Sequence, residues 1–317
     1  VRHDVSRQSI FFEPNIWLRG NAWEIKAKMN SELPDLTTMV NYRDDSNPMN
    51  IILGNMQLRN IHYYDIEGGK TFEGKKHRRL NINMGYHQTD NAVAYSLVFD
   101  KQTGVSTVQP ISVNGNYRIE LGIGYTRSLD KKEKLSIDNQ ASFNYNHNVD
   151  MAMVQGATQS QRSIVNNWKI SNVLKLNYRL DDNYEFTLHG GGTYYLIKSQ
   201  REGFSNIHAG DYNIGVNVQV ALPWKIQLTT DLTMFARRGY QLSEMNTTDW
   251  IWNAQLSRSF INKKLLVKLQ GFDILRQLSN TQYLMNAQGR TETWNNSIPR
   301  YVMLSLSWRF NVNPKKK

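Results

Sequence analysis

Residues 301–310 (YVMLSLSWRF) alternate between apolar and mostly polar side chains without a break. The apolar set is Val302, Leu304, Leu306, Trp308 and Phe310. This period of two is the geometry of a β-strand, whose successive side chains point to opposite faces. Ten residues is about twice the usual strand length, but it suffices to cross a bilayer at a tilt of roughly 45°. We therefore predict a strand in a wall between lipid and water.

The same alternation recurs upstream of this strand. Segments with the pattern begin at Leu80, Tyr117, Leu135, Trp168, Tyr184, Tyr212, Trp224 and Leu265. A slip of one residue would place charged side chains in lipid, so the register is firmly specified. We predict an all-β fold, an antiparallel transmembrane β-barrel with about 13 strands in this chain, beginning near Ile10 and ending at Phe310.

The connections between the predicted strands alternate between short and long. The short ones are 20–21, 130–133, 181–183, 222–223 and 261–263, and the long ones are 33–56, 148–162, 199–207, 239–248 and 274–299. Outer-membrane barrels have tight periplasmic turns and long external loops, whereas sandwiches and propellers need no such segregation. Segments 80–99 and 105–125 are predicted as one long hairpin, with its tip at 100–104, that projects above the membrane.

The overall composition suits a polar soluble protein, with 40% hydrophobic residues, 21% charged residues and a mean hydropathy of -0.57. In a barrel, however, only every second residue meets lipid, so the average stays polar. No run of about 18 apolar residues occurs, which excludes a transmembrane helix. Many aromatic residues lie near strand ends, as in interfacial girdles, although they could also be ordinary strand formers: Trp23, Tyr178, Tyr184, Trp224, Trp250, Trp252 and Trp308.

Charge and cysteine content limit the partners. Zero cysteines among 317 residues exclude disulfides, thiolate metal sites and cysteine nucleophiles. The net charge of +11 is spread along the chain, apart from Lys315, Lys316 and Lys317, so we predict no nucleic-acid partner. We expect the charges in the lumen, at the rims and against outer-membrane lipid and lipopolysaccharide headgroups. Residues 1–310 form the predicted barrel, and 311–317 form a basic tail. Because no signal peptide opens the sequence, we expect a mature or truncated piece with upstream strands missing.

Three stretches resemble a known family. Segment 33–58 (LPDLTTMVNYRDDSNPMNIILGNMQL) carries Asn47-Pro48, Gly54-Asn55 and Leu58 where the family has them, with Met56 at a usual proline. Residues 86–114 resemble the family's long hairpin, and Trp308-Arg309-Phe310 its closing strand. The chain thus resembles the C-terminal β-barrel region of Bacteroidota-type TonB-dependent outer-membrane receptors, of the outer membrane protein beta-barrel family.

This resemblance implies a barrel of about 22 strands, of which this chain would hold the last 13 or so. It implies a location in the bacterial outer membrane and import of a scarce nutrient, driven by the TonB energy complex through a plug domain that is absent here. It also implies that the barrel-assembly machinery reads Val302, Leu304, Leu306, Trp308 and Phe310 as a C-terminal signal, although seven residues follow the usual terminal aromatic.

No catalytic motif is present, so we predict no enzyme and no cofactor. The seven histidines show no paired ligand spacing, which argues against a metal site. Residues 44–47 (DDSN) could hold calcium, but turn chemistry before Pro48 explains them more simply. The residues 190–192 (GGG) sit inside a predicted strand, where they allow a bend.

The predicted external loops carry aromatic and basic residues suited to a small-molecule or oligomer ligand: Tyr42, Arg43, Trp250, Trp252, Tyr283 and Trp294. Interfacial anchoring is the alternative, notably for Trp250 and Trp252.

Two other functions remain open. A closed barrel of 12 or 14 strands from this chain alone would suit an adhesin or surface scaffold, and Ser, His and acidic side chains converging at one rim would suit an enzyme.

Overall fold

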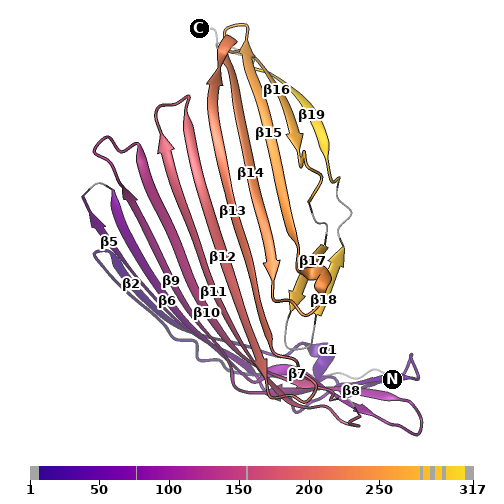
Figure 1. Cartoon of the computed structure of the whole chain (residues 1–317). Coiled ribbons are helices and arrows are strands. Elements are labelled where there is room, and N and C mark those ends of the chain that lie inside the picture. Colours follow the sequence, from indigo (N-terminus) through magenta and orange to yellow (C-terminus); the bar gives the residue numbers. More distant parts are fainter. Residues whose placement is uncertain are drawn as a thin grey trace, which may run out of the picture.

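One antiparallel sheet of 13 strands dominates the computed structural model, which describes residues 7–75, 77–154, 156–278, 281–285, 290–294 and 298–310 (Figure 1). In spatial order its strands are β1 (Asn15–Gly20), β2 (Trp23–Glu32), β5 (Ile61–Gly74), β6 (Arg78–Asp90), β9 (Asn116–Ser128), β10 (Leu135–Ala152), β11 (Gln161–Arg179), β12 (Glu185–Ser199), β13 (Ile207–Leu222), β14 (Ile226–Arg238), β15 (Thr248–Phe260), β16 (Leu265–Phe272) and β19 (Tyr301–Trp308). The predicted fold class and strand number are confirmed.

The two ends of the sheet differ. Tight connections such as 21–22 and 261–264 join strands at one end, which we name the turn end. All the longer connections lie at the other, the loop end, together with β7 (Ala92–Phe99) and the β17 (Thr281–Met285)–β18 (Arg290–Trp294) hairpin (Figure 1). The sheet is curved, and in the described part of the chain its first and last strands, β1 and β19, are not paired with each other.

Each strand presents one apolar and one polar face, and the pairing keeps these faces in register. Leu188 on β12 lies opposite Leu176 and Val216, and Val216 lies opposite Leu232. The apolar side chains remain largely uncovered, with Ile214 at 52%, Leu188 at 52% and Leu304 at 64% exposure. The sheet therefore does not pack its apolar face against a second layer, which excludes a sandwich.

The predicted long hairpin keeps its antiparallel pairing, β6 with β9 and β7 with β8 (Ser106–Val113), and its tip at 100–104, but it bends sharply between these two pairs. Asn91 adopts φ 57° and Gly115 adopts φ 105°, so the chain leaves the main sheet after β6 and re-enters it at β9. Between these points, β7 and β8 join β3 (Arg43–Asp44) and β4 (Asn50–Leu53) in a separate four-stranded sheet. The left-handed backbone at both positions turns the strands away from the main sheet, and a regular, uninterrupted β-ladder does not contain such a turn.

A compact core exists only at the loop end of the described structure. Met39, at the end of the short helix α1 (Leu36–Met39), is buried with Leu58, and Ala94 of β7 and Val149 of β10 are also buried. Asn55 Nδ2 donates to the Pro110 carbonyl at 2.8 Å and ties the β4–β5 connection to β8. The loops thus form a packed cap on one end of the sheet.

Helices contribute little to the fold. Besides α1, the described residues form only two single 3₁₀ turns, η1 (Pro223–Lys225) at the turn end and η2 (Ser243–Met245) at the loop end. Across the described ranges, no helix has the length and apolar character needed to cross a bilayer.

Candidate functional site

Aromatic side chains border the apolar face near both ends. At the loop end, Tyr86, Tyr117, Tyr145 and Trp168 stand on four neighbouring strands. Successive ring centres in this loop-end belt are 6.1, 5.8 and 5.1 Å apart. A second, turn-end belt contains Phe72, Tyr125, Tyr178 and Phe186. Two such belts are typical of the two interfaces of a membrane.

The spacing between the belts matches a bilayer. Trp168 and Tyr178 both lie on the apolar face of β11 and differ by ten in sequence number. That separation corresponds to about 34 Å along a strand, or about 24 Å across the membrane at a tilt of roughly 45°. The apolar band of an outer-membrane barrel is about 25 Å tall. The apolar face therefore has the dimensions of a lipid-facing wall.

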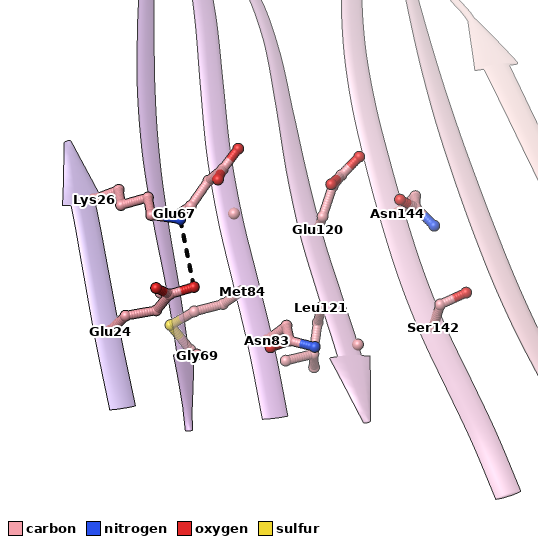
Figure 2. Close-up of a pocket in the computed structure, with 13 residues that line it drawn as sticks. Glu24, Lys26, Glu67, Gly69, Asn83, Met84, Glu120, Leu121, Ser142 and Asn144 are labelled. Carbon is pink, nitrogen blue, oxygen red and sulfur yellow. Dashed lines mark hydrogen bonds and ion pairs between the residues drawn. The ribbon is translucent and has the colours of Figure 1, made fainter. Parts of the chain in front are cut away.

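A hollow of about 340 Å³, which we name the trough, marks the polar face (Figure 2). It crosses β2, β5, β6, β9 and β10. Its lining includes Glu24, Lys26, Glu67, Gly69, Asn83, Gly85, Glu120, Gly122, Ser142 and Asn144. The alternation of each strand and the cross-strand register Asn83–Gly122–Ser142 bring these side chains to one surface.

Glycines set the depth of the trough. A Cβ at Gly122 would meet only Asn83 Cβ, at 3.9 Å, so the backbone of β9 is open to an approaching group. At Gly69 the space is already occupied, because a Cβ there would lie 2.6 Å from Asn83 Oδ1. Gly122 is thus the point where a ligand or protein segment can approach the wall most closely.

A charged network lies beside the trough toward the loop end. His87 Nδ1 is 2.6 Å from Asp65 Oδ1, and its Nε2 is 3.8 Å from Glu120 Oε2. Lys28 lies 3.3 Å from Asp65, and Arg118 lies 2.8 Å from Glu120. The Asp65 and His87 side chains are each 18% exposed. The network fixes alternating charges on four adjacent strands of the polar face.

The trough is suited to binding rather than to covalent chemistry. Glu24, Glu67 and Glu120 present carboxylates along it (Figure 2). Lys26 lies 3.5 Å from Glu24 and Arg118 lies 2.8 Å from Glu120, so their negative charge is partly offset. Carboxylates beside an open backbone suit cationic groups and hydrogen-bond donors.

Outside the trough, one serine–histidine pair occurs at the loop end. Ser31 Oγ is 2.8 Å from His62 Nδ1. Asp90 lies opposite His62 in register, but it accepts a hydrogen bond from Gln88 instead. These contacts do not form the relay of nucleophile, base and orienting acid that a triad needs.

A second polar cluster lies near the loop end. The Tyr240 hydroxyl donates to Asp211 Oδ1 at 2.8 Å, and Arg237 Nε is 4.0 Å from the same oxygen. Burial, followed by the hydrogen bond to Asp211, raises the pKa of Tyr240, so its hydroxyl stays a donor at neutral pH. Lys169 lies 5.9 Å from the centre of the Tyr195 ring.

The residues predicted to bind ligand do not form one site. Tyr42 and Arg43 lie exposed in the connection between β2 and β5, as expected. The loop placement of Trp250 and Trp252 is wrong, because both lie within β15 on the apolar face, opposite Met234 and Leu232. Tyr283 and Trp294 belong to β17 and β18, and their side chains lie outside the described residues.

The acidic loop 44–47 makes turn contacts. The Ser46 amide donates to Asp44 Oδ1 at 3.1 Å, and this side-chain and backbone bonding lowers the pKa of Asp44. The Met49 amide donates to Asn47 Oδ1 at 3.1 Å, just after Pro48. Within the described ranges, no three His, Asp or Glu side chains gather in a metal-binding arrangement.

Sequence reasoning missed both the trough and the charged network. Their residues occupy the polar positions of the alternating pattern, but the alternation alone does not say which of these positions become neighbours on adjacent strands. Asp65 and His87 are 22 residues apart and become neighbours only through the β5–β6 register. The run of acidic and glycine residues at these polar positions, Glu67, Gly69, Gly85, Glu120 and Gly122, was the available signal.

These faces define the wall of a transmembrane β-barrel, with lipid on the apolar side and water on the polar side. A model of the outer membrane protein beta-barrel family matches residues 19–191 and 157–308, so the chain belongs to that family. It is accordingly a protein of the bacterial outer membrane. No curated protein shows a significant match to it.

Proposed function

We propose that this chain forms part of the barrel of a TonB-dependent receptor that imports a scarce nutrient. In this proposal the loop-end cap, including Tyr42 and Arg43, contributes to ligand capture outside the cell. A plug domain fills the lumen, and the TonB energy complex moves it. The turn end faces the periplasm, as is general for outer-membrane barrels.

The directions of the two edge strands carry this proposal. β1 and β19 both run from the loop end to the turn end. They therefore cannot pair in the antiparallel manner of the other strands, and an antiparallel barrel needs an odd number of additional strands. About nine more would give the 22 strands of plugged outer-membrane transporters. A self-contained adhesin or scaffold of 12 or 14 strands does not fit these directions.

The polar face supports a filled lumen. The carboxylates around the trough and the open backbone at Gly122 offer a docking surface for a segment that carries guanidinium or amide groups. The side chains of a 22-stranded wall cannot fill the lumen that the wall encloses. Another protein element therefore has to block this lumen when no ligand is present.

Residues 1–317 contain no cysteine, so an introduced thiol is the only one in this part of the barrel. Ser142→Cys places a thiol in the trough, and Ala141→Cys, the matched control one residue earlier in β10, places it on the lipid face. We expect a small water-soluble maleimide to label S142C in intact cells severalfold faster when the inner membrane is energised than after an uncoupler is added. The physical reason is that movement of the plug exposes the trough.

The outcomes separate the rival functions. Energy-independent labelling of S142C would contradict import and favour an adhesin or scaffold. As a control, S142C should be labelled at the same rate in a strain without the energy complex as in cells treated with the uncoupler. If the water-soluble reagent labels A141C as fast as S142C, the assignment of the two faces itself is wrong.

We also propose that the closing strand is the signal for the barrel-assembly machinery. Val302, Leu304, Leu306, Trp308 and Phe310 all lie uncovered on the apolar face or its continuation, and the Trp308 and Phe310 rings are 6.2 Å apart. W308S/F310S should lower the amount of folded protein in the outer membrane severalfold, because it removes two large apolar anchors. Heat-modifiable mobility on gels measures the folded fraction, and S305A/S307A on the polar face should leave it unchanged.

A further inference from the structure

Unpaired arginines stand just beyond the turn-end belt on the lipid face. Arg78 opens β6 and Arg127 lies near the end of β9. The β6–β9 ladder ends with Arg79 opposite Thr126, and Arg78 and Arg127 are the next residues outward on the two strands. Both side chains are exposed. Arg78 lies two residues from Leu80 and Arg127 two residues from Tyr125, so both arginines point to the lipid face, where Leu80 and Tyr125 lie opposite each other.

Two neighbouring basic side chains contact carboxylates, but Arg78 and Arg127 contact none among the described residues. Arg79 lies 3.0 Å from Glu73, and His77 lies 2.8 Å from Glu133. Within the described part of the chain, Arg78 and Arg127 have no carboxylate within 4.0 Å. Like charges at neighbouring strand positions destabilise a sheet, so this pair favours an anion between or beside the two guanidinium groups.

A third cation on the same face points toward this pair. Lys70 of β5 lies two residues nearer the membrane centre than Phe72, and its Nζ is 4.8 Å from the centre of the Phe72 ring. A lysine at such a depth extends its ammonium group toward the interface. Phe72 lies opposite Leu80, and Leu80 lies opposite Tyr125, so the three cations lie on the same three strands as this part of the turn-end belt.

The backbone beside Arg78 is bare, and further cations lie in the adjacent turn. A Cβ at Gly74 would lie 2.7 Å from Arg78 Nε, so the guanidinium lies close to bare backbone of β5. Exposed Lys131 and Lys132 lie in the turn after β9 and add to the positive potential.

We infer that Lys70, Arg78 and Arg127 form a binding site for the phosphate of an anionic phospholipid headgroup in the leaflet at the turn end. Arginine binds phosphate through paired N–H donors, and the aromatic rings of Phe72 and Tyr125 hold the glycerol region at the interface. The site depends on the membrane wall and not on import. The basic residues of segments 70–79 and 127–134 looked dispersed in the sequence, and strand pairing brings them together.

Native mass spectrometry of the complete barrel, including the strands that close this sheet, tests this site in mild detergent with dioleoyl phosphatidylglycerol as the probe. The wild type should retain phosphatidylglycerol in preference to phosphatidylcholine and phosphatidylethanolamine. R78Q/R127Q should weaken phosphatidylglycerol binding roughly 30-fold, since each cation at a membrane surface contributes roughly fivefold. R78K/R127K keeps the charge but loses the paired donors, so its affinity should be intermediate.

The matched control is K175Q/K268Q, which removes the same charge from the polar face of β11 and β16. It should bind phosphatidylglycerol like the wild type. Heat-modifiable mobility confirms that each variant is folded before the comparison. Equal losses in R78Q/R127Q and K175Q/K268Q would overturn the inference, and so would equal binding of phosphatidylethanolamine and phosphatidylglycerol by the wild type.

Discussion

Val216→Arg should destabilise the folded protein by about 2–4 kcal/mol, the cost of an arginine near the bilayer midplane on the lipid face of a barrel. Val216 lies near the middle of β13, between the two aromatic belts, and faces Leu188 and Leu232 on the neighbouring strands. Its side chain is 38% exposed. In a water-soluble protein, a charge at so exposed a position would change the stability by less than about 0.5 kcal/mol.

The matched variant is Asn217→Arg, one residue further along β13 and on the polar face. Asn217 lies opposite Asp231, so the new guanidinium gains a carboxylate across the strands and remains in water. Its effect on the free energy of unfolding should stay within about 0.5 kcal/mol of the wild type. Guanidinium-induced unfolding of the closed barrel in phospholipid vesicles, followed by tryptophan fluorescence, measures both variants. Equal costs at the two positions would show that the faces are misassigned.

Much of this architecture follows from local pattern. The alternation in 301–310 predicts β19 and its two faces, and equivalent patterns predict the 13-strand sheet with its segregated turns and loops. Such patterns are readable because a lipid-facing wall constrains every second residue along its whole height. The lipid-facing positions can therefore be predicted from each strand's own sequence, without knowing which strands are its neighbours.

Breaks in the strands were harder to predict. Asn114-Gly115 is a turn signal inside a segment predicted to be continuous, and the structure bends there, with Gly115 at φ 105°. Asn91 bends the partner strand and donates its amide to Asn114 Oδ1 at 2.6 Å. The alternation continues through both bends, so periodicity alone did not reveal that β7 and β8 leave the main sheet.

Contacts across strands were beyond the reach of a single sequence. The pairing of Asp65 with His87 and the neighbouring positions of Arg78 and Arg127 depend on the register of β5, β6 and β9. Trp250 and Trp252 look equally suited to a loop or a strand, and only the ladder with β14 places them on the apolar face. The strand register therefore determines which side chains form the candidate sites, whereas the period-two alternation is enough to predict the membrane wall.

Residues 1–317 produced alone should give no stable monomer in detergent, because no strand among the described residues pairs with the outer edges of β1 and β19. β1 has 6 residues and β19 has 8. An antiparallel edge strand leaves about one N–H and one C=O free for every two residues, so about 14 backbone groups lack partners at the two edges. At roughly 2 kcal/mol or more for each group in an apolar medium, the cost reaches tens of kcal/mol. The net stability of a folded domain is only about 5–15 kcal/mol.

Size-exclusion chromatography and heat-modifiable mobility measure this outcome, with the expected result being oligomers or aggregates joined at the β1 and β19 edges. Refolding together with a segment that supplies an odd number of further strands should restore a heat-modifiable monomer. A monodisperse, heat-resistant monomer from residues 1–317 alone would instead require β1 and β19 to close the sheet as a parallel pair. Because those two strands run in the same direction, that result would convert the open sheet into a 13-stranded barrel and remove the argument for a larger, plugged receptor.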